Sequence, residues 1–207
     1  MSVLVVDYGL SNLGSIRRSL EECGASPRVS DDPKGLKTAT RIVLPGVGSF
    51  ADGMSNLHSM GWVTALREAV REDRIPLLGI CLGMQLLADR GNEGGDIEGL
   101  GLIMGEVRRF QPEAPGVRIP HVGWNEVHKA SEHPLFDDIP DRSDFYFVHS
   151  YHFVPGKPET VLSTTPYCSG FASAVGNGNV FGVQFHPEKS GRPGFQLLKN
   201  FLKIQGA

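Results

Sequence analysis

The stretch IPLLGICLGMQLL, residues 75–87, joins two segments of opposite character. Its first six residues form a short, continuous apolar run, which is typical of a strand buried on both faces of a sheet. The overlapping stretch CLGMQLLADR, residues 81–90, is typical of a helix. Cys81 lies at the junction, between Gly79 and Gly83. We therefore predict a buried strand that passes directly into a helix, with a cysteine at the turn.

The residues before this stretch repeat the alternation of strand and helix. In one segment Leu13, Ile16 and Leu20 recur at helical spacing, and Gly24 follows as a stop signal. The expected strands are residues 3–7, 26–30 and 41–46, and the expected helices are residues 11–24 and 53–74. Short apolar strands that alternate with helices are typical of a parallel sheet covered on both faces. We predict an α/β fold with a doubly wound, mostly parallel sheet.

The second half of the chain has a different pattern, in which strand-like segments follow one another. The expected strands are residues 101–110, 118–127, 145–154, 160–167, 170–180 and 180–188. We expect a loop at residues 111–116 and a turn at residues 176–179. Near the C-terminus, one helical stripe contains Phe195, Leu198, Phe201 and Leu202. We therefore predict one domain over residues 1–207, with an antiparallel addition in its C-terminal half.

Composition and charge narrow the functional class. The chain has 207 residues, of which 40% are hydrophobic, and a net charge of -3, so there is no electrostatic case for nucleic acid or an anionic membrane. No apolar run approaches the roughly 20 residues that span a bilayer. The three cysteines are widely spaced and form no CxxC pair, which indicates neither a disulfide framework nor a zinc site. We expect a cytoplasmic protein with no metal.

The pentapeptide GICLG, residues 79–83, has the form of a nucleophile elbow with cysteine in place of serine. Small residues on both sides of Cys81 allow a sharp turn from strand to helix. The helix N-terminus favours thiolate over thiol, which makes a cysteine more reactive near neutral pH. A core thiol beside closely packed glycines would give the same pentapeptide, so Cys81 needs a partner base before it predicts catalysis.

His186 is the strongest candidate for that base among the seven histidines. In His186-Pro187-Glu188, proline biases the histidine to extended geometry, so residues i and i+2 point to the same side. A carboxylate beside an imidazole fixes its tautomer and stabilises its protonated form. The other histidines are more simply explained by structural roles. We expect His58, His128 and His133 at the surface, and His149 and His152 packed in the interior. The role of His121 is ambiguous.

The stretch PGVGSF, residues 45–50, predicts an oxyanion site. Glycines just after a strand let backbone N–H groups face a developing negative charge. The amide of Val47 or Gly48, together with that of Leu82, would make a hole with two donors. Residues 46–51 also fit the dinucleotide fingerprint G-x-G-x-x-A, but the next strand carries no acidic residue at its end. His186-x-Glu188 likewise matches the H-x-E of zinc deaminases, but no P-C-x-x-C follows.

Together these motifs resemble the class I, or triad, glutamine amidotransferases, which carry a G-x-C-x-G elbow and a C-terminal H-P-E. Six blocks carry the resemblance, from the first strand almost to the last helix: DYGLSNLGS (7–15), LPGVGSFADGM (44–54), GICLGMQLL (79–87), PHVGWNEV (120–127), YFVHSY (146–151) and GVQFHPEKS (182–190). PGVGSF and PHVGWN are the more specific pair. They are most similar to glutaminase subunits of a synthase in histidine biosynthesis. The implied fold is flavodoxin-like.

The resemblance implies a role for each matching position. Cys81 would be the nucleophile, His186 the general base and acid, and Glu188 the residue that orients His186. The remaining implied roles are the oxyanion hole at Val47, Gly48 and Leu82, substrate contacts at Gly46, Gln85, Ser150 and Tyr151, and a partner interface at Trp124, Asn125 and Lys189.

The implied reaction is hydrolysis of L-glutamine to glutamate and ammonia through a cysteine thioester, without a cofactor. By the same resemblance, ammonia passes to a separate (β/α)₈ cyclase subunit in a heterodimer. That subunit makes imidazole glycerol phosphate and aminoimidazole carboxamide ribotide.

Three alternatives remain open. One is the glutaminase of pyridoxal phosphate synthesis, although that family carries a different loop at the PGVGSF position. The second is a peptidase or chaperone-like hydrolase on the same architecture, and the third is a catalytically silent scaffold, which would be expected to have lost a triad residue.

Overall fold

The computed structural model describes residues 2–112 and 117–205, and thirteen strands form within these ranges. The strands are β1 (Ser2–Val6), β2 (Ser26–Ser30), β3 (Arg41–Gly46), β4 (Leu77–Cys81), β5 (Arg90–Gly91), β6 (Ile97–Glu98), β7 (Gly105–Arg109), β8 (His121–Lys129), β9 (Ser143–His149), β10 (Tyr151–Pro155), β11 (Val161–Thr165), β12 (Phe171–Asn177) and β13 (Val180–Val183). Part of the loop expected at residues 111–116 lies outside the described residues.

Five α-helices and four short 3₁₀ turns connect these strands in the described chain. The helices are α1 (Leu13–Glu22), α2 (Phe50–Ser59), α3 (Trp62–Arg71), α4 (Leu82–Leu86) and α5 (Gly191–Lys203). The 3₁₀ turns are η1 (Pro33–Thr38), η2 (Pro134–Phe136), η3 (Pro158–Thr160) and η4 (Pro187–Lys189). None of the helices in the described residues is long and apolar enough to cross a membrane.

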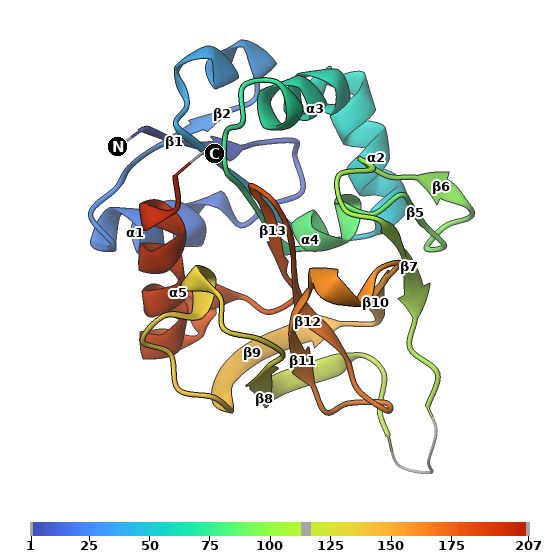
Figure 1. Ribbon diagram of the computed structural model, residues 1–207. Coiled ribbons are helices and arrows are strands. Elements are labelled where there is room, and N and C mark those ends of the chain that lie inside the picture. The colour runs from blue at the N-terminus through green and yellow to red at the C-terminus, as the bar shows by residue number, and fades with distance from the viewer. Residues whose placement is uncertain (1, 113–116, 206–207) are drawn as a thin grey trace.

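The main sheet has nine strands in the order β2-β1-β3-β4-β13-β12-β11-β8-β9. The first five strands of this order run parallel, and the remaining pairs are antiparallel. This confirms the predicted α/β sheet with an antiparallel addition. A second sheet of four strands, in the order β10-β7-β5-β6, was not predicted. Figure 1 shows it beside α2 and α4.

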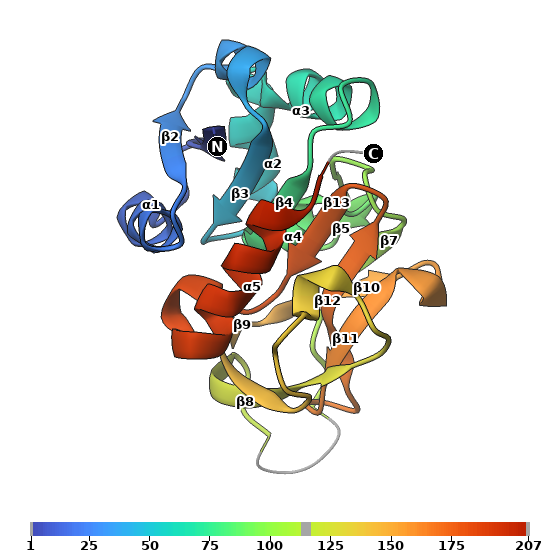
Figure 2. The same cartoon turned by 60° about the vertical axis from the view of Figure 1, so that its left-hand side comes forward.

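Helices cover both faces of the parallel strands, as Figure 2 shows. Because side chains alternate along a strand, β1 sends Leu4 to one buried cluster and Val5 to the other. The first cluster contains residues of α2, α3 and α4, such as Leu57 and Leu66. The second contains residues of α1 and α5, such as Leu20. The sheet is therefore doubly wound, as the continuous apolar strands indicated.

The prediction of a single helix over residues 53–74 is wrong. Two helices occupy the region, α2 and α3, and Gly61 between them adopts φ 76°. Glycine reaches this left-handed conformation without steric cost, and it ends the first helix. The first helix also begins earlier than predicted, because the Ser49 side chain caps it by accepting from the Asp52 amide at 3.1 Å.

Three other predicted elements are shorter than their sequence patterns, and a fourth is divided in two. The helix after Cys81 ends at Leu86, because residues 87–91 turn away to begin the second sheet. The strands expected at 101–110 and 180–188 are confined to β7 and β13. The strand expected at 145–154 is two strands, β9 and β10, which lie in different sheets. These boundaries depend on which sheet each residue joins, and local patterns do not encode that choice.

Candidate active site

Cys81 lies on the sharpest turn of the parallel sheet, where β4 passes directly into α4. Its backbone has φ 54° and ψ -110°, which is a strained conformation for a residue other than glycine. Its neighbours must lack side chains for this turn to form. A Cβ on Gly79 would lie 2.6 Å from the Gly83 carbonyl oxygen, and one on Gly83 would overlap the Leu44 carbonyl. The predicted elbow is therefore present, with Cys81 buried at 6% exposure.

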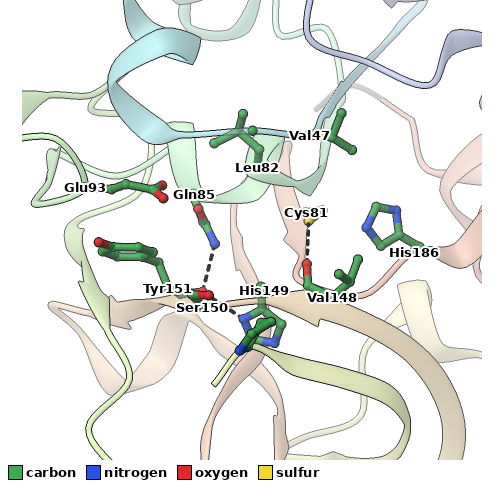
Figure 3. A pocket seen from close by; sticks show the side chains of 12 residues that line it. Val47, Cys81, Leu82, Gln85, Glu93, Val148, His149, Ser150, Tyr151 and His186 are labelled. Atoms are coloured by element: carbon green, nitrogen blue, oxygen red, sulfur yellow. Dashed lines mark hydrogen bonds between the residues drawn. The ribbon is translucent and has the colours of Figure 1, made fainter. Parts of the chain in front are cut away.

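His186 follows β13, which pairs in parallel with β4 and so ends at the same edge of the sheet. The histidine Nδ1 lies 2.8 Å from Oε1 of Glu188, and both side chains are 3% exposed. Because an ionised carboxylate only accepts, Nδ1 carries the proton and donates it to Glu188. Within the described residues Nε2 makes no hydrogen bond. Figure 3 shows the His186 ring facing Cys81, so this free nitrogen is available to the reacting groups.

Electrostatics in the site favour a charged His186. Burial alone would lower the pKa of His186, but the Cys81 thiolate and the Glu188 carboxylate outweigh burial and raise this pKa to about 10. Because Nε2 of His186 makes no hydrogen bond with regular geometry, we conclude that the Cys81 sulfur raises the pKa of His186 mainly through its charge. The arrangement therefore favours an imidazolium at His186 near neutral pH.

A cavity of about 370 Å³ opens between these residues. Cys81 and His186 lie toward one end of it and Glu93 toward the other, as Figure 3 shows. Its lining contains Val47, Gly48, Cys81, Leu82, Gln85, Glu93, Pro120, Val148, His149, Ser150, Tyr151 and His186. Most of the residues predicted for the nucleophile, oxyanion and substrate sites therefore meet in one cavity.

Gly46 is the predicted substrate residue that does not line the cavity. It lies beside Cys81 in the β3–β4 register, and a Cβ there would overlap the Tyr8 hydroxyl and lie 2.9 Å from the Leu82 side chain. We conclude that Gly46 allows β3 and α4 to approach closely. Its contact with the substrate stays a prediction.

The predicted oxyanion segment follows β3, directly beside the elbow. Gly48 has φ 119°, which glycine adopts readily and other residues do not. The Val47 amide donates to the Leu10 carbonyl at 2.7 Å. In this conformation Val47 is therefore not a free donor for an oxyanion, which differs from the role predicted for it. That role would require the bond to Leu10 to break.

The predicted partner residues lie outside the cavity. Trp124 is 57% exposed, and its ring meets that of Tyr146 edge-on at 6.1 Å. The Lys189 ammonium lies 5.7 Å from the centre of the same Tyr146 ring. These three side chains form one surface group. Asn125 points elsewhere, because its side chain bonds to the buried His121 at 3.2 Å.

Glu93 and Gln184 are site residues that sequence reasoning missed. Glu93 lies in the polar loop between β5 and β6 and accepts from the Phe50 amide at the start of α2. Burial raises the pKa of this carboxyl. No motif marks Glu93, so only the fold could reveal it. Gln184 had a signal, because the sequence pattern predicts an extended segment over residues 180–188, in which Gln184 would share a side with His186.

Two glutamines connect the cavity to the nucleophile. The amide nitrogen of Gln85 donates to the Tyr151 carbonyl at 2.9 Å and to Oε1 of Gln184 at 3.0 Å. The amide nitrogen of Gln184 then lies 3.8 Å from the Cys81 sulfur. Gln184 is fully buried. Both N–H groups of Gln85 are thus used within the protein, which leaves its carbonyl oxygen to accept from a ligand.

Comparison with known proteins identifies the family. The model of the family "Glutamine amidotransferase class-I" matches residues 4–204. The chain is 49% identical to imidazole glycerol phosphate synthase subunit HisH of Moorella thermoacetica, covering 98% of this chain and 94% of that protein. It is 45% identical to the subunit of the same name from Pseudomonas putida, covering 99% and 98%.

Solved structures share the fold at lower identity. The structure of PurLQS from Thermotoga maritima superposes with a TM-score of 0.74 at 21% identity and covers 97% of both chains. A glutamine amidotransferase from the same organism gives 0.65 at 24% identity and covers 98% of this chain and 82% of that one. The chain therefore belongs to the class-I glutamine amidotransferase family, in the branch of the HisH subunits of imidazole glycerol phosphate synthase.

Proposed function

We propose that this chain is the glutaminase subunit of an imidazole glycerol phosphate synthase, acting as a single domain in the cytoplasm. It hydrolyses the side-chain amide of L-glutamine to glutamate and ammonia. The observation that carries this proposal is Cys81 on a strained elbow, facing the buried His186–Glu188 pair across a cavity.

The chemistry uses the two charged groups of the site. The Cys81 thiolate attacks the amide carbon, and His186 gives its Nε2 proton to the departing nitrogen. Ammonia leaves and a glutamyl thioester remains. His186, now neutral, accepts a proton from water, which attacks the thioester and releases glutamate. Glu188 holds the ring by its bond to Nδ1 throughout. Proton transfer by such a residue is typically worth about 10²–10⁴ in rate.

The cavity has a suitable group for each end of glutamine. The Glu93 carboxylate, at the end away from Cys81 in Figure 3, suits the α-ammonium group. Ser150 and Tyr151 line the same cavity, and we assign the α-carboxylate to them. The carbonyl oxygen of Gln85 remains free to accept from the ligand. We assign these residues to substrate binding. We assign the oxyanion hole to the amides of Leu82 and Gly48, joined by the Val47 amide once its bond to Leu10 is broken.

The bond between Val47 and Leu10 supports control by a partner. Because the Val47 amide is occupied, this conformation lacks one of the donors assigned to the oxyanion. Loss of one such donor typically costs about 10²–10³ in rate. We propose that the chain alone is a poor glutaminase and that its liganded partner releases Val47 from Leu10.

The relatives are synthase subunits by name, and we propose that the partner of this chain is a (β/α)₈ cyclase. This cyclase uses the ammonia to make imidazole glycerol phosphate and aminoimidazole carboxamide ribotide. On the outer face of β8 and β9, Val122 pairs with Val148 and Trp124 pairs with Tyr146. Val122 and Trp124 are each 57% exposed. A group of exposed apolar and aromatic side chains beside the cavity suits a docking surface for a partner protein.

The test combines labelling with activation. A glutamine-mimicking electrophile should label Cys81 and inhibit hydrolysis, and added cyclase with its nucleotide substrate should raise glutamine turnover by about 10²-fold or more. A peptidase of the same architecture would not react with this electrophile. Full turnover by the isolated chain, unchanged on adding the liganded cyclase, would contradict the coupling.

A further inference from the structure

Two histidines that the proposed reaction does not use lie buried behind the cavity. His121 on β8 and His149 on β9 face each other in the strand register and are 4% and 7% exposed. Nδ1 of His121 lies 3.1 Å from Nε2 of His149. His149 also lines the cavity. Buried histidine pairs need a specific arrangement of protons, because each neutral ring donates from one nitrogen and accepts at the other.

The outer end of this pair sets the direction of its hydrogen bonds. The Glu126 amide donates to Oδ1 of Asn125 at 2.9 Å, which identifies the other end of the Asn125 side chain as its NH₂ group. That group lies 3.2 Å from Nε2 of His121. Nε2 must therefore accept, and His121 carries its proton on Nδ1. This proton points to His149.

The inner end independently requires the same direction. Nδ1 of His149 lies 2.8 Å from the Tyr151 carbonyl oxygen, which can only accept. His149 therefore carries its proton on Nδ1, and its Nε2 accepts from His121. The chain runs one way, from Asn125 through His121 and His149 to Tyr151, with every donor matched to an acceptor.

Aromatic rings hold both imidazoles in place. The His121 ring stacks between Tyr167, at 3.9 Å, and Phe147, at 4.8 Å. The His149 ring lies 5.1 Å from the rings of both Phe110 and Phe171. Burial lowers the pKa of His121 to about 4 and that of His149 to about 3. Both rings are therefore neutral near pH 7, as a one-way chain requires.

The Tyr151 carbonyl at the end of the chain also accepts from Gln85 at 2.9 Å. Gln85 in turn bonds to Gln184, which contacts the Cys81 sulfur. We propose that Asn125, His121 and His149 are positioning residues: their one-way hydrogen-bond chain fixes the Tyr151 carbonyl and, through it, the Gln85 amide in the substrate cavity. That the substrate is glutamine rests on the proposed function, whereas the direction of the chain does not.

The direction can be measured in the full chain from the ¹⁵N shifts of the imidazole nitrogens, assigned by comparing histidine variants. Both His121 and His149 should be Nδ1–H tautomers. In Asn125→Asp, a nearly isosteric carboxylate cannot donate to His121, so Nε2 of His121 should gain a proton. In His128→Ala, which removes a partly exposed histidine bonded to Glu126 on the same strand, both rings should remain unchanged. An Nε2–H tautomer on either ring of the wild type would overturn the chain.

The positioning role is tested by glutaminase kinetics of the assembled synthase. Asn125→Asp and His149→Ala should raise KM for glutamine about tenfold and change kcat less than about threefold, because a buried hydrogen bond is lost from the binding site. His149→Asn keeps a donor at the Nδ1 position and should recover part of the loss. A fall in kcat at unchanged KM, or no change at all, would overturn the role. Inactive wild-type synthase would instead refute the proposed function, and the tautomers would still test the chain.

Discussion

At Cys81 three independent features act on one sulfur atom. The left-handed backbone raises the side chain above the sheet, His186 faces it, and the Gln184 amide lies 3.8 Å away. The first feature comes from the end of β4, and the other two come from the segment after β13. The sequence predicted the first two from the elbow and the H-P-E motif. Gln184 needed the structure, because its role depends on a bond to Gln85 from another element.

Gln184→Leu should slow the reaction of Cys81. The substitution keeps the side-chain volume but removes the donor to sulfur and leaves one N–H of Gln85 without its acceptor. We expect the rate of Cys81 alkylation at pH 7 to fall about tenfold, since a hydrogen bond to a charged group is typically worth about 1.5–3 kcal/mol. Alkylation kinetics measure this directly. Gln196→Leu on α5 is the matched control, and an equal effect there would refute the assignment.

At the scale of elements, the parallel strands and the helices between them followed from sequence patterns because each strand is a continuous apolar run. The helix break at Gly61 did not, since glycine within an apolar pattern is compatible with either a break or a continuous helix. Ser150, between β9 and β10, shows the same limit. The chain passes there from one sheet to the other, and this depends on long-range pairing with β7.

The junction of β4 and α4 should tolerate no side chain at Gly83. Gly83→Ala would bring a methyl group into the Leu44 carbonyl, and both atoms belong to rigid elements. We expect a loss of at least about 3 kcal/mol in the free energy of unfolding. Denaturant unfolding at pH 7 measures the change.

The matched control for that substitution is Gly14→Ala. A Cβ on Gly14, in α1, would have no neighbour within 4 Å. This variant should gain about 0.5–1 kcal/mol, because alanine favours the helix and restricts the unfolded chain. If Gly83→Ala were as stable as Gly14→Ala, the close approach of the two elements would be wrong.

For the whole molecule, the buried His121 and His149 should limit stability below pH 6.5. Below this pH the unfolded chain binds protons on these two histidines that the folded chain does not bind, because burial lowers their pKa values to about 4 and 3. The free energy of unfolding should therefore fall as the pH falls from 6.5 to 5, by up to roughly 1.4 kcal/mol per pH unit for each histidine.

Urea unfolding at pH 5 and 6.5 tests this expectation. Stability that rose between pH 6.5 and pH 5 would show that the two buried histidines accept protons in the folded chain.

The exposed group on β8 and β9 should dominate binding of the partner subunit. Trp124→Ala should weaken cyclase binding by about 10-fold or more, as is typical of a central aromatic interface residue, with little change in the chain's own stability. Titration of labelled chain with cyclase measures the affinity. Met104→Ala is the control, since Met104 is 51% exposed but precedes β7 on the other sheet. Equal loss in both variants would place the docking surface elsewhere.

The central claim is that Cys81 performs glutamine hydrolysis. It is tested most directly by measuring glutamate release from L-glutamine by the chain assembled with the proposed cyclase partner, in wild type and in Cys81→Ala. Removal of a nucleophile that forms the covalent intermediate should reduce kcat by about 10³-fold or more while the variant still binds the cyclase. Glutamate release by Cys81→Ala at a rate near that of the wild type would contradict the account.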